Sequence, residues 1–563
     1  MKNKNNKKEE EIKVADLATK TMDEKKYYQE LSSSRRSTWI KCYEAYMSSL
    51  DATKNPYLSN LFIPKTHEAI ELLAAFLAGP NQSIVAEAEG KDDTVKAQVS
   101  QKLLEWQWRK VLKARDKIII WVKQMLVFGD GIMKVGWDIS KDRAEGGVPF
   151  MVPSSISDVY MDFFSPTLQS SSPVIHRIVR NLNDIKNDRK YNSFRNDIIA
   201  VGASKEDEEK TQFSQFDDTV LLDSKEVPKG ELFERWTLKR FTTVANTSNG
   251  ATVLRDIPNP YGFIPFVKVK CKTNPLPNRA YNMGGIEPTL KIQKAFNDMV
   301  NEVFDNVSLI NNKQWIKRRG ARINPMDLVR RPGGIITVDD IEKDLKGEEI
   351  ADIKASALEV LRLLDNEFQQ ASMVVNLLKG VPGAEFATEA VLGQQNVQVL
   401  LDAIDGNIKD ALSELGQMIL ELDLKYLTKT QFLKVSDTEK DMTFLEFNPK
   451  EINGKYDVKI SADRSAMMGK AVRQKQMIDF MNMTARDEML SQQYPEMRIK
   501  LYKKWLEEAG FGDVNYFFGE AQPVQPAGAV GPTGVRRAGA REQLTPQAIQ
   551  QALTAQMLPK LRL

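Results

Sequence analysis

Hydrophobic and polar residues recur with helical spacing over most of the chain. The first predicted helix covers residues 23–46, and a second covers residues 67–78 before a Gly-Pro pair ends it. Two longer amphipathic helices are predicted over residues 95–111 and 114–128. The beginning of the chain is therefore expected to be helical.

Two tryptophans lie on different faces of the predicted helix over residues 95–111. Trp106 and Trp108 are two positions apart, and residues at that spacing cannot share one helical face. Core packing explains most large apolar residues of this helix pair. One of the two tryptophans remains a candidate for an interface with another molecule.

The pattern changes to period two at residues 129–138, "GDGIMKVGWD", which predicts a strand entered through a glycine turn. Further strand-like runs follow. Residues 259–272, "NPYGFIPFVKVKCK", close this region with a turn and a strand. The acidic run at residues 205–210 indicates a surface insertion. We therefore expect a β-rich region between residues 129 and 272.

Three long helices are predicted in the second half, over residues 288–310, 352–378 and 389–427. Pro288 suits the first turn of the first helix, because its missing N–H loses no hydrogen bond there. At 1.5 Å per residue this helix is a rod of about 34 Å. Its apolar stripe consists of Ile292, Phe296, Met299, Val303, Val307 and Ile310, whereas Lys291, Lys294, Asp298, Glu302 and Asp305 fall largely elsewhere.

A small, strongly basic module separates the first two of these helices. Pro, Gly and β-branched residues replace the helical pattern, which predicts short strands and turns. These cations require a counter-charge, either nucleic-acid phosphates or an acidic protein surface. The alternative is a solvated loop whose cations pair with neighbouring subunits or with the acidic insertion. Against the single acid Asp327, the cations are Lys313, Lys317, Arg318, Arg319, Arg322, Arg330 and Arg331.

The last part of the chain contains further helices and strands and then a linker. Glycines inside the third long helix predict a kink or close packing. A Pro/Gly/Ala-rich linker follows Phe518, and a final helix over residues 546–558 is too short to be stable alone. It therefore requires a partner, copies of itself included. Strands are predicted at residues 432–437, 442–449 and 456–462, and helices at 466–483, 487–490 and 497–509.

Composition narrows the class of protein. The 563 residues carry a formal net charge of +3, so bulk charge gives no argument for nucleic-acid binding. Cys42 and Cys271 are far apart in the chain, which predicts two buried small apolar side chains rather than a disulfide or a zinc site. No uncharged apolar run reaches the ~20 residues of a membrane span. The N-terminal residues lack the apolar core of a signal peptide, so we expect a charged, disordered arm.

The chain lacks the common catalytic motifs. There is no phosphate-binding G-x-x-x-x-G-K-[ST] loop, no H-E-x-x-H, no C-x-x-C and no G-x-S-x-G. His67 and His176 each lack a nearby second ligand and are expected to form ordinary hydrogen bonds. Acid-x-Lys triplets beginning at Asp184, Asp344 and Asp352 are interpreted as charged helix faces. We therefore predict no enzymatic activity, no metal site and no cofactor.

Five segments together resemble one family, and their order and spacing are specific although each is weak alone. The chain resembles the portal, or head-to-tail connector, proteins of tailed double-stranded DNA bacteriophages, most closely the short-tailed branch. The resemblance covers residues 30 to 510. The segments are "NLFIPKTHEAIELLAAFLAGPN" (60–81), "MLVFGDGIMKVGWD" (125–138), "NPYGFIPFV" (259–267), "GGIEPTLKIQKAFNDMVN" (284–301) and "KGVPGAEFATEA" (379–390).

The resemblance implies a mixed α+β, helix-rich portal fold that assembles as a ring. The implied parts follow one another in the chain. After the disordered arm over residues 1–25 come a wing of helices and strands (26–285), a descending stem helix (286–310), a clip (311–350), an ascending stem helix (351–378), a tunnel loop (379–388), a long wing helix with returning strands (389–465), a crown (466–520), and a linker with a barrel-like C-terminal helix (521–563).

The resemblance also implies a function. Such a protein forms a dodecameric ring at one capsid vertex of the virion, after assembly in the host cytoplasm, and conducts the genome during packaging and ejection. The clip cations would contact DNA, terminase or adaptor, and the polar side of the stem helix would face the bore or solvent. The implied tunnel-loop residues are Lys379, Gly380, Val381, Pro382, Gly383, Glu385 and Phe386.

The implied partners are other copies of the chain, double-stranded DNA bound without sequence preference, a separate ATP-driven large terminase, the major capsid protein and head-to-tail adaptor or tail proteins. No membrane partner is expected. On the long wing helix, acids outnumber lysines, and acids that face the bore would repel phosphate and prevent sticking. Two alternatives are another head-to-tail ring component and, further from the pattern, a DNA-processing enzyme.

Overall fold

The computed structural model shows a mixed helix and sheet protein with two compact units, residues 1–468 and 469–563. All elements described below belong to the first unit. The predicted helices after residue 463, and with them the crown and the C-terminal extension, lie outside the described residues. The structure describes residues 2–462 except 51–54, 56–57, 79–81, 89–93, 142–146, 201–227, 249, 312–314, 329–334, 339, 342, 348–354, 373–386, 428–430, 435–443 and 448–455.

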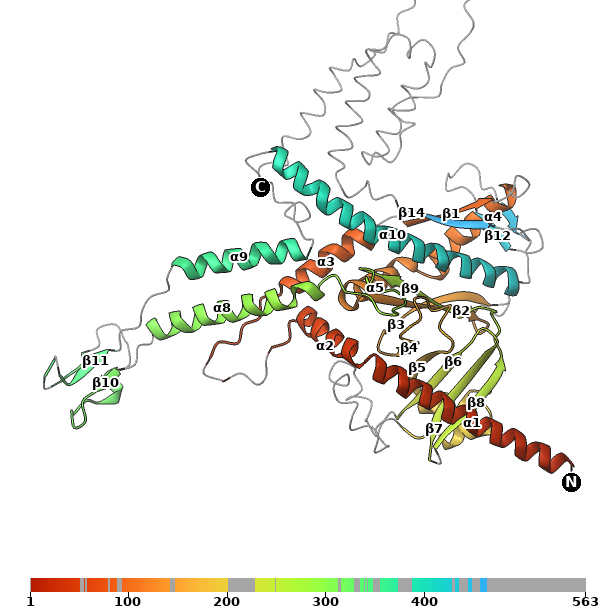
Figure 1. Cartoon of the computed structure of the whole chain (residues 1–563), viewed down its shortest axis with the longest axis horizontal. Helices are drawn as coiled ribbons and strands as arrows, with labels where there is room; N and C mark the ends of the chain where they lie inside the picture. Colours follow the sequence, from red (N-terminus) through yellow and green to blue (C-terminus); the bar gives the residue numbers. More distant parts are fainter. Residues whose placement is uncertain are drawn as a thin grey trace, which may run out of the picture. The chain divides into compact units, whose positions relative to one another are not determined.

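The core of the first unit is a bundle of helices packed on a three-stranded sheet, and we call this part the body (Figure 1). Helix α5 (Ala114–Phe128) lies at its centre, and Trp121 and Met125 of this helix are fully buried. The sheet has the order β3-β2-β9 and is antiparallel. The other body elements are α2 (Ser33–Met47), α3 (Lys65–Ala78), β2 (Asp130–Asp138), β3 (Val148–Ser154), β9 (Phe266–Lys270) and α10 (Ala387–Tyr426).

A second, five-stranded antiparallel sheet has the order β4-β5-β6-β7-β8, so consecutive strands are neighbours. This arrangement confirms the predicted β-rich region between residues 129 and 272. The short elements α6 (Leu182–Asn187) and η3 (Ser193–Asp197) follow β5. The strands are β4 (Val159–Tyr160), β5 (Val174–Asn181), β6 (Lys229–Trp236), β7 (Arg240–Thr247) and β8 (Gly250–Pro258).

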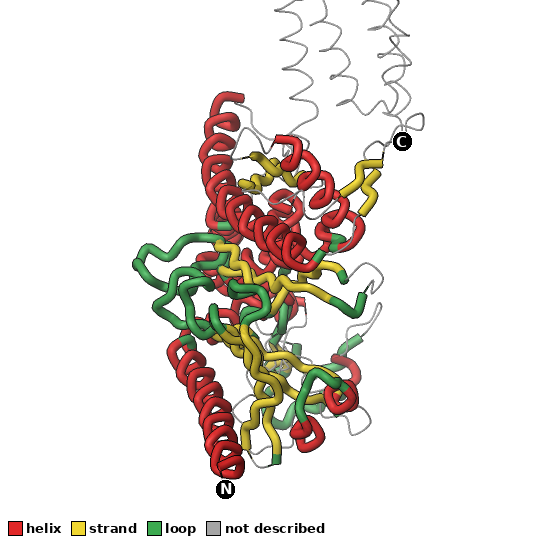
Figure 2. The backbone as a smooth tube through the Cα atoms, turned by 90° about the vertical axis from the view of Figure 1, so that its right-hand side faces the viewer, coloured by secondary structure: helices red, strands yellow, loops and turns green. Residues whose placement is uncertain are grey.

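Helix α1 (Lys2–Leu31) runs alongside this five-stranded sheet (Figure 2). Ala18 and Tyr28 are buried in a cluster with Phe233 of β6, and Glu24 accepts hydrogen bonds from Arg235. A disordered arm was predicted over residues 1–25, but residues 16–25 belong to α1, and apolar side chains of this part pack on the sheet. The single helix predicted over residues 23–46 is two helices, α1 and α2.

Strand β1 (Gln82–Ala88) pairs in antiparallel fashion with β14 (Tyr456–Ala462). The periodicity of the sequence did not predict β1, whereas it did predict β12 (Gln431–Lys434), β13 (Phe444–Phe447) and β14. Strands β12 and β13 form a separate antiparallel pair. The last described strand of the first unit is thus joined to a strand from its early part, which follows α3.

The predicted helix over residues 95–111 is divided into α4 (Thr94–Trp106) and a π-helical turn, η2 (Gln107–Val111). Trp108 is buried in the body core, whereas Trp106 is 38% exposed. The two tryptophans therefore do face different surroundings, as their spacing predicts.

Candidate functional site

Two antiparallel helices project from the body and carry a small module at their far ends (Figure 1). They are α8 (Leu290–Asn311), preceded by the 3₁₀ turn η6 (Glu287–Thr289), and α9 (Ala355–Ala371). We call α8, the module over residues 311–350 and α9 together the hairpin. Phe296 and Val300 of α8 and Phe368 of α9 are buried apolar side chains of the two helices. The predicted rods over residues 288–310 and 352–378 are therefore present, the second one described only as far as Ser372.

The base of α8 is joined to the body through a buried polar junction. Asp130, at the start of β2, accepts hydrogen bonds from the backbone N and from Nδ2 of Asn282, at 2.8 and 2.6 Å. Arg35 of α2 donates to Glu287 at 2.8 Å and to the carbonyl of Asn282. The segment before α8 is therefore held by two elements of the body.

Close backbone packing explains the glycines on both sides of this junction. Gly129 has a φ of +96°, and a Cβ there would lie 2.2 Å from the carbonyl oxygen of Asn282. A Cβ on Gly284 would lie 2.7 Å from the carbonyl oxygen of Val127. Only glycine allows this approach without displacing the backbone. The motifs "GDG" and "YNMGG" are thus two halves of one contact.

Burial changes the ionisation of the charged groups at the junction. Asp130 is completely buried, and the loss of solvent raises the pKa of its carboxyl group. Burial also lowers the pKa of Lys268, whose ammonium group donates to the backbone carbonyls of Pro166 and Ala280. Both groups serve packing, since their hydrogen-bond partners belong to the fold itself.

One face of α8 binds an extended segment of the chain, residues 58–63, which we call the strap. Asn301 accepts from the backbone N of Leu61 at 2.7 Å and donates to its carbonyl at 3.0 Å. Asp305 accepts from the backbone N of Ser59 at 2.7 Å. Nearer the body, Asn297 and Gln293 bind the N and O of Ile63 at 3.2 and 2.9 Å. We call Gln293, Asn297, Asn301 and Asp305 the amide ladder.

The spacing of the two elements explains this match. Four residues along a helix advance about 6.0 Å, and two residues along an extended chain advance about 6.6 Å. A helix face with polar side chains four residues apart therefore meets every second peptide group of a neighbouring extended segment. The strap is held through its backbone, and Leu61 is left about half exposed.

The strap corrects one prediction about α8. The sequence predicted that the polar side of this helix, with Asp305 in it, faces a bore or solvent, but Asp305 binds the strap instead. Lys291, Lys294, Asp298 and Glu302 are exposed as expected. The signal that was missed is the recurrence of Gln, Asn and Asn at positions four apart. At the end of the strap, Lys65 donates to Asp365 of α9 and lies 4.0 Å from the ring centroid of Phe296, so it contacts both helices.

The basic module contains the short antiparallel strands β10 (Trp315–Lys317) and β11 (Leu345–Gly347), with a 3₁₀ turn, η7 (Pro325–Leu328), between them. The predicted cations Lys317, Arg318, Arg319 and Arg322 are exposed. The structure thus brings four predicted cations onto one small module. Lys313, Arg330 and Arg331 lie outside the described residues.

An acid of the module does not have the role that the sequence predicted. The triplet beginning at Asp344 was interpreted as a charged helix face, but Asp344 is 1% exposed and precedes strand β11. It accepts from the backbone N of Asp340 at 2.9 Å and pairs with Arg318 at 3.0 Å. This acid therefore stabilises the module from inside.

Several large apolar side chains of the module are exposed. Ile335 and Ile341 are 78% and 83% exposed. Trp315, Ile316 and Met326 are also exposed. A single copy of the chain thus presents apolar and cationic side chains on the same module.

The acids of α10 divide into exposed and buried groups. Asp402, Asp410 and Glu421 are exposed. Asp405 is buried and pairs with Lys409 at 2.9 Å, and Asp423 is buried with a hydrogen bond from Gln107. The hypothesis that acids of this helix repel DNA therefore applies only to the exposed acids, because the buried ones form contacts within the chain.

The histidines and cysteines occupy structural positions. His67 Nδ1 lies 3.1 Å from the carbonyl of Tyr46, and buried His176 Nδ1 lies 3.9 Å from Glu234. Cys42 and Cys271 are buried as predicted, and burial raises the pKa of both thiols to about 12. Within the described ranges, no three His, Cys, Asp or Glu side chains are grouped to hold a metal ion.

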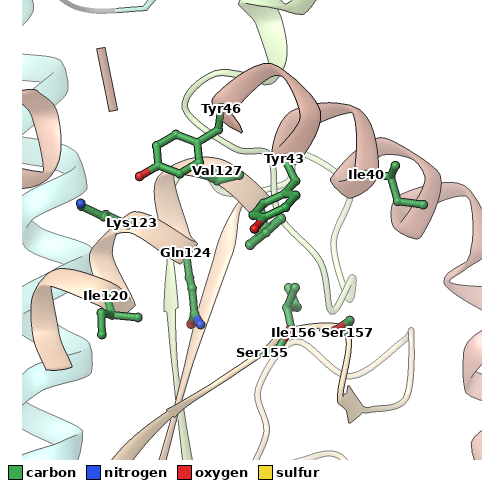
Figure 3. Close-up of a pocket in the computed structure, with 11 residues that line it drawn as sticks. Ile40, Tyr43, Tyr46, Ile120, Lys123, Gln124, Val127, Ser155, Ile156 and Ser157 are labelled. Carbon is green, nitrogen blue, oxygen red and sulfur yellow. Dashed lines mark hydrogen bonds between the residues drawn. The ribbon is translucent and has the colours of Figure 1, made fainter. Parts of the chain in front are cut away.

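A cavity of about 300 Å³ lies between α2, α5 and the segment after β3 (Figure 3). Ile40, Tyr43 and Ile120 give it an apolar lining, and Lys123 is already paired with Glu71 at 2.7 Å. The figure shows Gln124 pointing from α5 toward the segment that carries Ser155 and Ser157. This arrangement contains no nucleophile activated by a neighbouring base.

A family model described as phage SU10 portal protein matches residues 155–559. The chain belongs to this portal family. The match covers more than two thirds of the sequence, and it spans the five-stranded sheet, the hairpin and α10. The interpretation of the chain as a phage portal protein is thereby confirmed. No curated protein matches the chain.

Membership of the portal family defines what kind of protein this is. Portal proteins are structural components of the phage capsid, so membership of the family gives the chain a structural role. The short-tailed branch named by the sequence resemblance is compatible with the SU10 family. None of the described helices of this portal chain is long and apolar enough to cross a membrane.

The implied tunnel loop of the portal lies outside the described residues. This applies to Lys379, Gly380, Val381, Pro382, Gly383, Glu385 and Phe386. The two segments "NLFIPKTHEAIELLAAFLAGPN" and "MLVFGDGIMKVGWD" precede the matched residues. In the structure they supply the strap, α3 and the junction at the base of α8, so they position the hairpin.

Proposed function

We propose that twelve copies of this chain form a ring at one vertex of a short-tailed phage capsid and that the ring is the channel for the genome. The observation that carries the proposal is the outer surface of the hairpin. Phe304 of α8 and Leu363 of α9 are 52% and 57% exposed, and neighbouring apolar residues are exposed with them. Such side chains favour burial against another protein surface, and identical hairpins around an axis supply one.

The order of the elements suits a tube. In the proposed ring α8 descends from the wing as one stem helix, residues 311–350 form the clip, and α9 returns as the other stem helix. Repeating two antiparallel rods around an axis produces a double wall. Residues 379–388 would line the narrowest part of the channel, and residues 389–465 would return to the wing. Residues 466–520 would form the crown, and 521–563 a barrel-like extension.

A moving DNA duplex requires weak contacts to its backbone and no reading of bases. Exposed acids of α10, such as Asp402 and Asp410, would repel phosphate where they face the channel. The clip combines exposed cations with exposed apolar residues, which suits protein partners. We therefore assign to it the large terminase during packaging and head-to-tail adaptor or tail proteins afterwards. The wing would contact the major capsid protein.

Native mass spectrometry and electron micrographs of the purified full chain test the proposal. The expected result is a closed ring of about twelve subunits with a central hole. A monomer or dimer at every salt concentration, also in the presence of the phage scaffold protein, would refute the ring. Complementation of a portal-deficient phage then tests the channel: the wild-type chain should restore DNA-filled heads, and a ring that restores none would refute the channel function alone.

A further inference from the structure

A buried acid and a buried amide meet where the end of α10 packs against the π-helical turn η2. Gln107 is the first residue of η2, and its Nε2 donates to Asp423 Oδ1 at 2.8 Å. Asp423 lies in the last turn of α10. The two residues are 1% and 2% exposed, so solvent does not take part in the contact. They are 316 positions apart in the chain.

One oxygen on each side chain has no partner. Gln107 Oε1 and Asp423 Oδ2 are both inaccessible to solvent and accept no hydrogen bond from the described part of the chain. A carboxylate only accepts hydrogen bonds. An ionised Asp423 would therefore leave its own Oδ2 and Gln107 Oε1 without a hydrogen-bond donor. A protonated carboxyl group has one O–H donor, and Gln107 Oε1 is an acceptor in need of one.

We propose that Asp423 is a neutral carboxylic acid in the folded chain and that its O–H donates to Gln107 Oε1. The acid and the amide then form a closed ring of two hydrogen bonds, which latches the end of α10 to η2. We call this pair the acid–amide latch. It goes beyond the channel function and does not depend on ring assembly.

The surroundings of the pair favour the neutral acid. Burial raises the pKa of Asp423 to about 8, and the Gln107 hydrogen bond opposes this shift only in part. Among the residues that the structure describes, no charged side chain contributes to the shift. The charged residues nearest in sequence are Glu105, Arg109 and Lys110 beside Gln107, and Glu421 and Lys425 beside Asp423; strand β2, which also packs against α10, carries Lys134 and Asp138.

The latch holds a local conformation that a helix does not adopt readily. In η2 the backbone N of Leu112 donates to the carbonyl of Gln107, five residues back, at 2.8 Å. Single π-helical turns insert one extra residue into a helix and are frequent at functional sites. The latch stabilises this turn, and with it the burial of Trp108 in the body core. Loss of the proton at alkaline pH would place unsatisfied acceptors side by side and open the latch.

Infrared spectroscopy detects the proton directly, because a protonated carboxyl group has a carbonyl band distinct from that of a carboxylate. We compare the wild-type full chain with Asp423→Asn at pH 6. The matched control is Asp405→Asn on the same helix, because buried Asp405 forms an ion pair with Lys409. The expected difference spectrum shows loss of one protonated-acid band for Asp423→Asn and none for Asp405→Asn. A carboxylate band lost from Asp423→Asn would overturn the proposal.

Thermal unfolding gives a second, independent readout. Asparagine at position 423 supplies an N–H donor for Gln107 Oε1 and an acceptor for Gln107 Nε2 at every pH. The pKa of Asp423 is raised from its ordinary value of 3.8 to about 8, so its stabilisation is lost as the pH rises between these two values. The wild type should therefore lose melting temperature between about pH 4 and pH 8, and Asp423→Asn should lose less over the same interval. An Asp423→Asn variant that melts below the wild type at pH 9 would also overturn the latch.

Discussion

The body and the hairpin of the first unit differ in how far their large apolar side chains are exposed to solvent. In the body, Trp121, Ile70 and Leu73 are at most 1% exposed, and exposed apolar side chains such as Ile120 of α5 and Val399 of α10 lie outside this core. In the hairpin, Phe304, Leu363 and Ile341 are more than half exposed. The body thus completes its core within one chain. The exposed apolar side chains of the hairpin are typical of a surface that contacts other protein molecules, as the proposed ring requires.

The largest effect is expected from a change at the body junction. Gly129→Ala adds a Cβ 2.2 Å from a backbone oxygen at a φ of +96°, so we expect a loss of about 4 kcal/mol or more in the free energy of unfolding. The control is Gly262→Ala, which has a φ of +91° but nothing within 4 Å of the added Cβ. It should lose only about 1 kcal/mol. Equal denaturation midpoints for the two variants would contradict the close packing at Gly129.

A buried ion pair inside the body should produce the next largest effect. Glu234 of β6 and Lys134 of β2 join the two sheets at 2.6 Å. Glu234→Gln leaves Lys134 without its counter-charge, and the expected loss at pH 7 is about 3 kcal/mol.

The same pair gives a defined pH dependence. Lys134 and His176 beside the buried Glu234 hold its pKa well below the ordinary value of 4.5. Its stabilisation is therefore complete above pH 4.5 and is lost as the pH falls below it. The difference in melting temperature between wild type and Glu234→Gln should narrow between pH 5 and pH 2. A constant difference over that range would show that the charge of Glu234 does not stabilise the fold.

A smaller and more local effect is expected at the amide ladder. Asn301→Leu keeps a similar volume but removes the bonds to Leu61, and we expect a loss of about 2 kcal/mol. Hydrogen exchange of the strap amides should rise roughly ten-fold or more, while exchange in α5 stays unchanged. Asp298→Asn, on the exposed face of the same helix, is the control and should leave the strap protected. Unchanged exchange at Leu61 in Asn301→Leu would mean that the ladder does not hold the strap.

The smallest effect on the single chain should come from the exposed apolar residues of the hairpin. Leu363→Ser should change the free energy of unfolding by less than about 0.5 kcal/mol, because the side chain is exposed. It should nevertheless reduce the fraction of chains in rings, measured by native mass spectrometry. Leu238→Ser is the control, since Leu238 is 52% exposed in the bend between β6 and β7 and lies outside the hairpin. Equal ring fractions for both variants would remove the support that the hairpin gives to the ring.

Local periodicity predicted many elements well. The helix predicted over residues 288–310 is observed as η6 and α8, and the helix predicted over 389–427 is observed as α10 (Ala387–Tyr426). These elements have long apolar stripes, and such stripes are visible in sequence. The exposed cations of the module were also predicted, because their residue types leave little choice of environment.

The missed features all depend on contacts between distant residues. The strap has no periodic pattern of its own, and its partners on α8 are more than 200 positions away. Strand β1 exists through its pairing with β14. The burial of Asp344, which was expected on a charged face, depends on the local fold of the module. Periodicity reports which side of an element is apolar, and it does not report which distant backbone or charge will meet the polar side.

The pairing of β1 with β14 has a consequence for biosynthesis. Strand β1 emerges from the ribosome early, but its partner emerges after almost all of the first unit, including the entire hairpin. Long-range strand pairing is slow, because a large loop must close before the contacts form. Strand β1 therefore remains without its partner β14 while the hairpin is being synthesised. Closure of this pair therefore comes late in the folding of the first unit, after the hairpin has been synthesised.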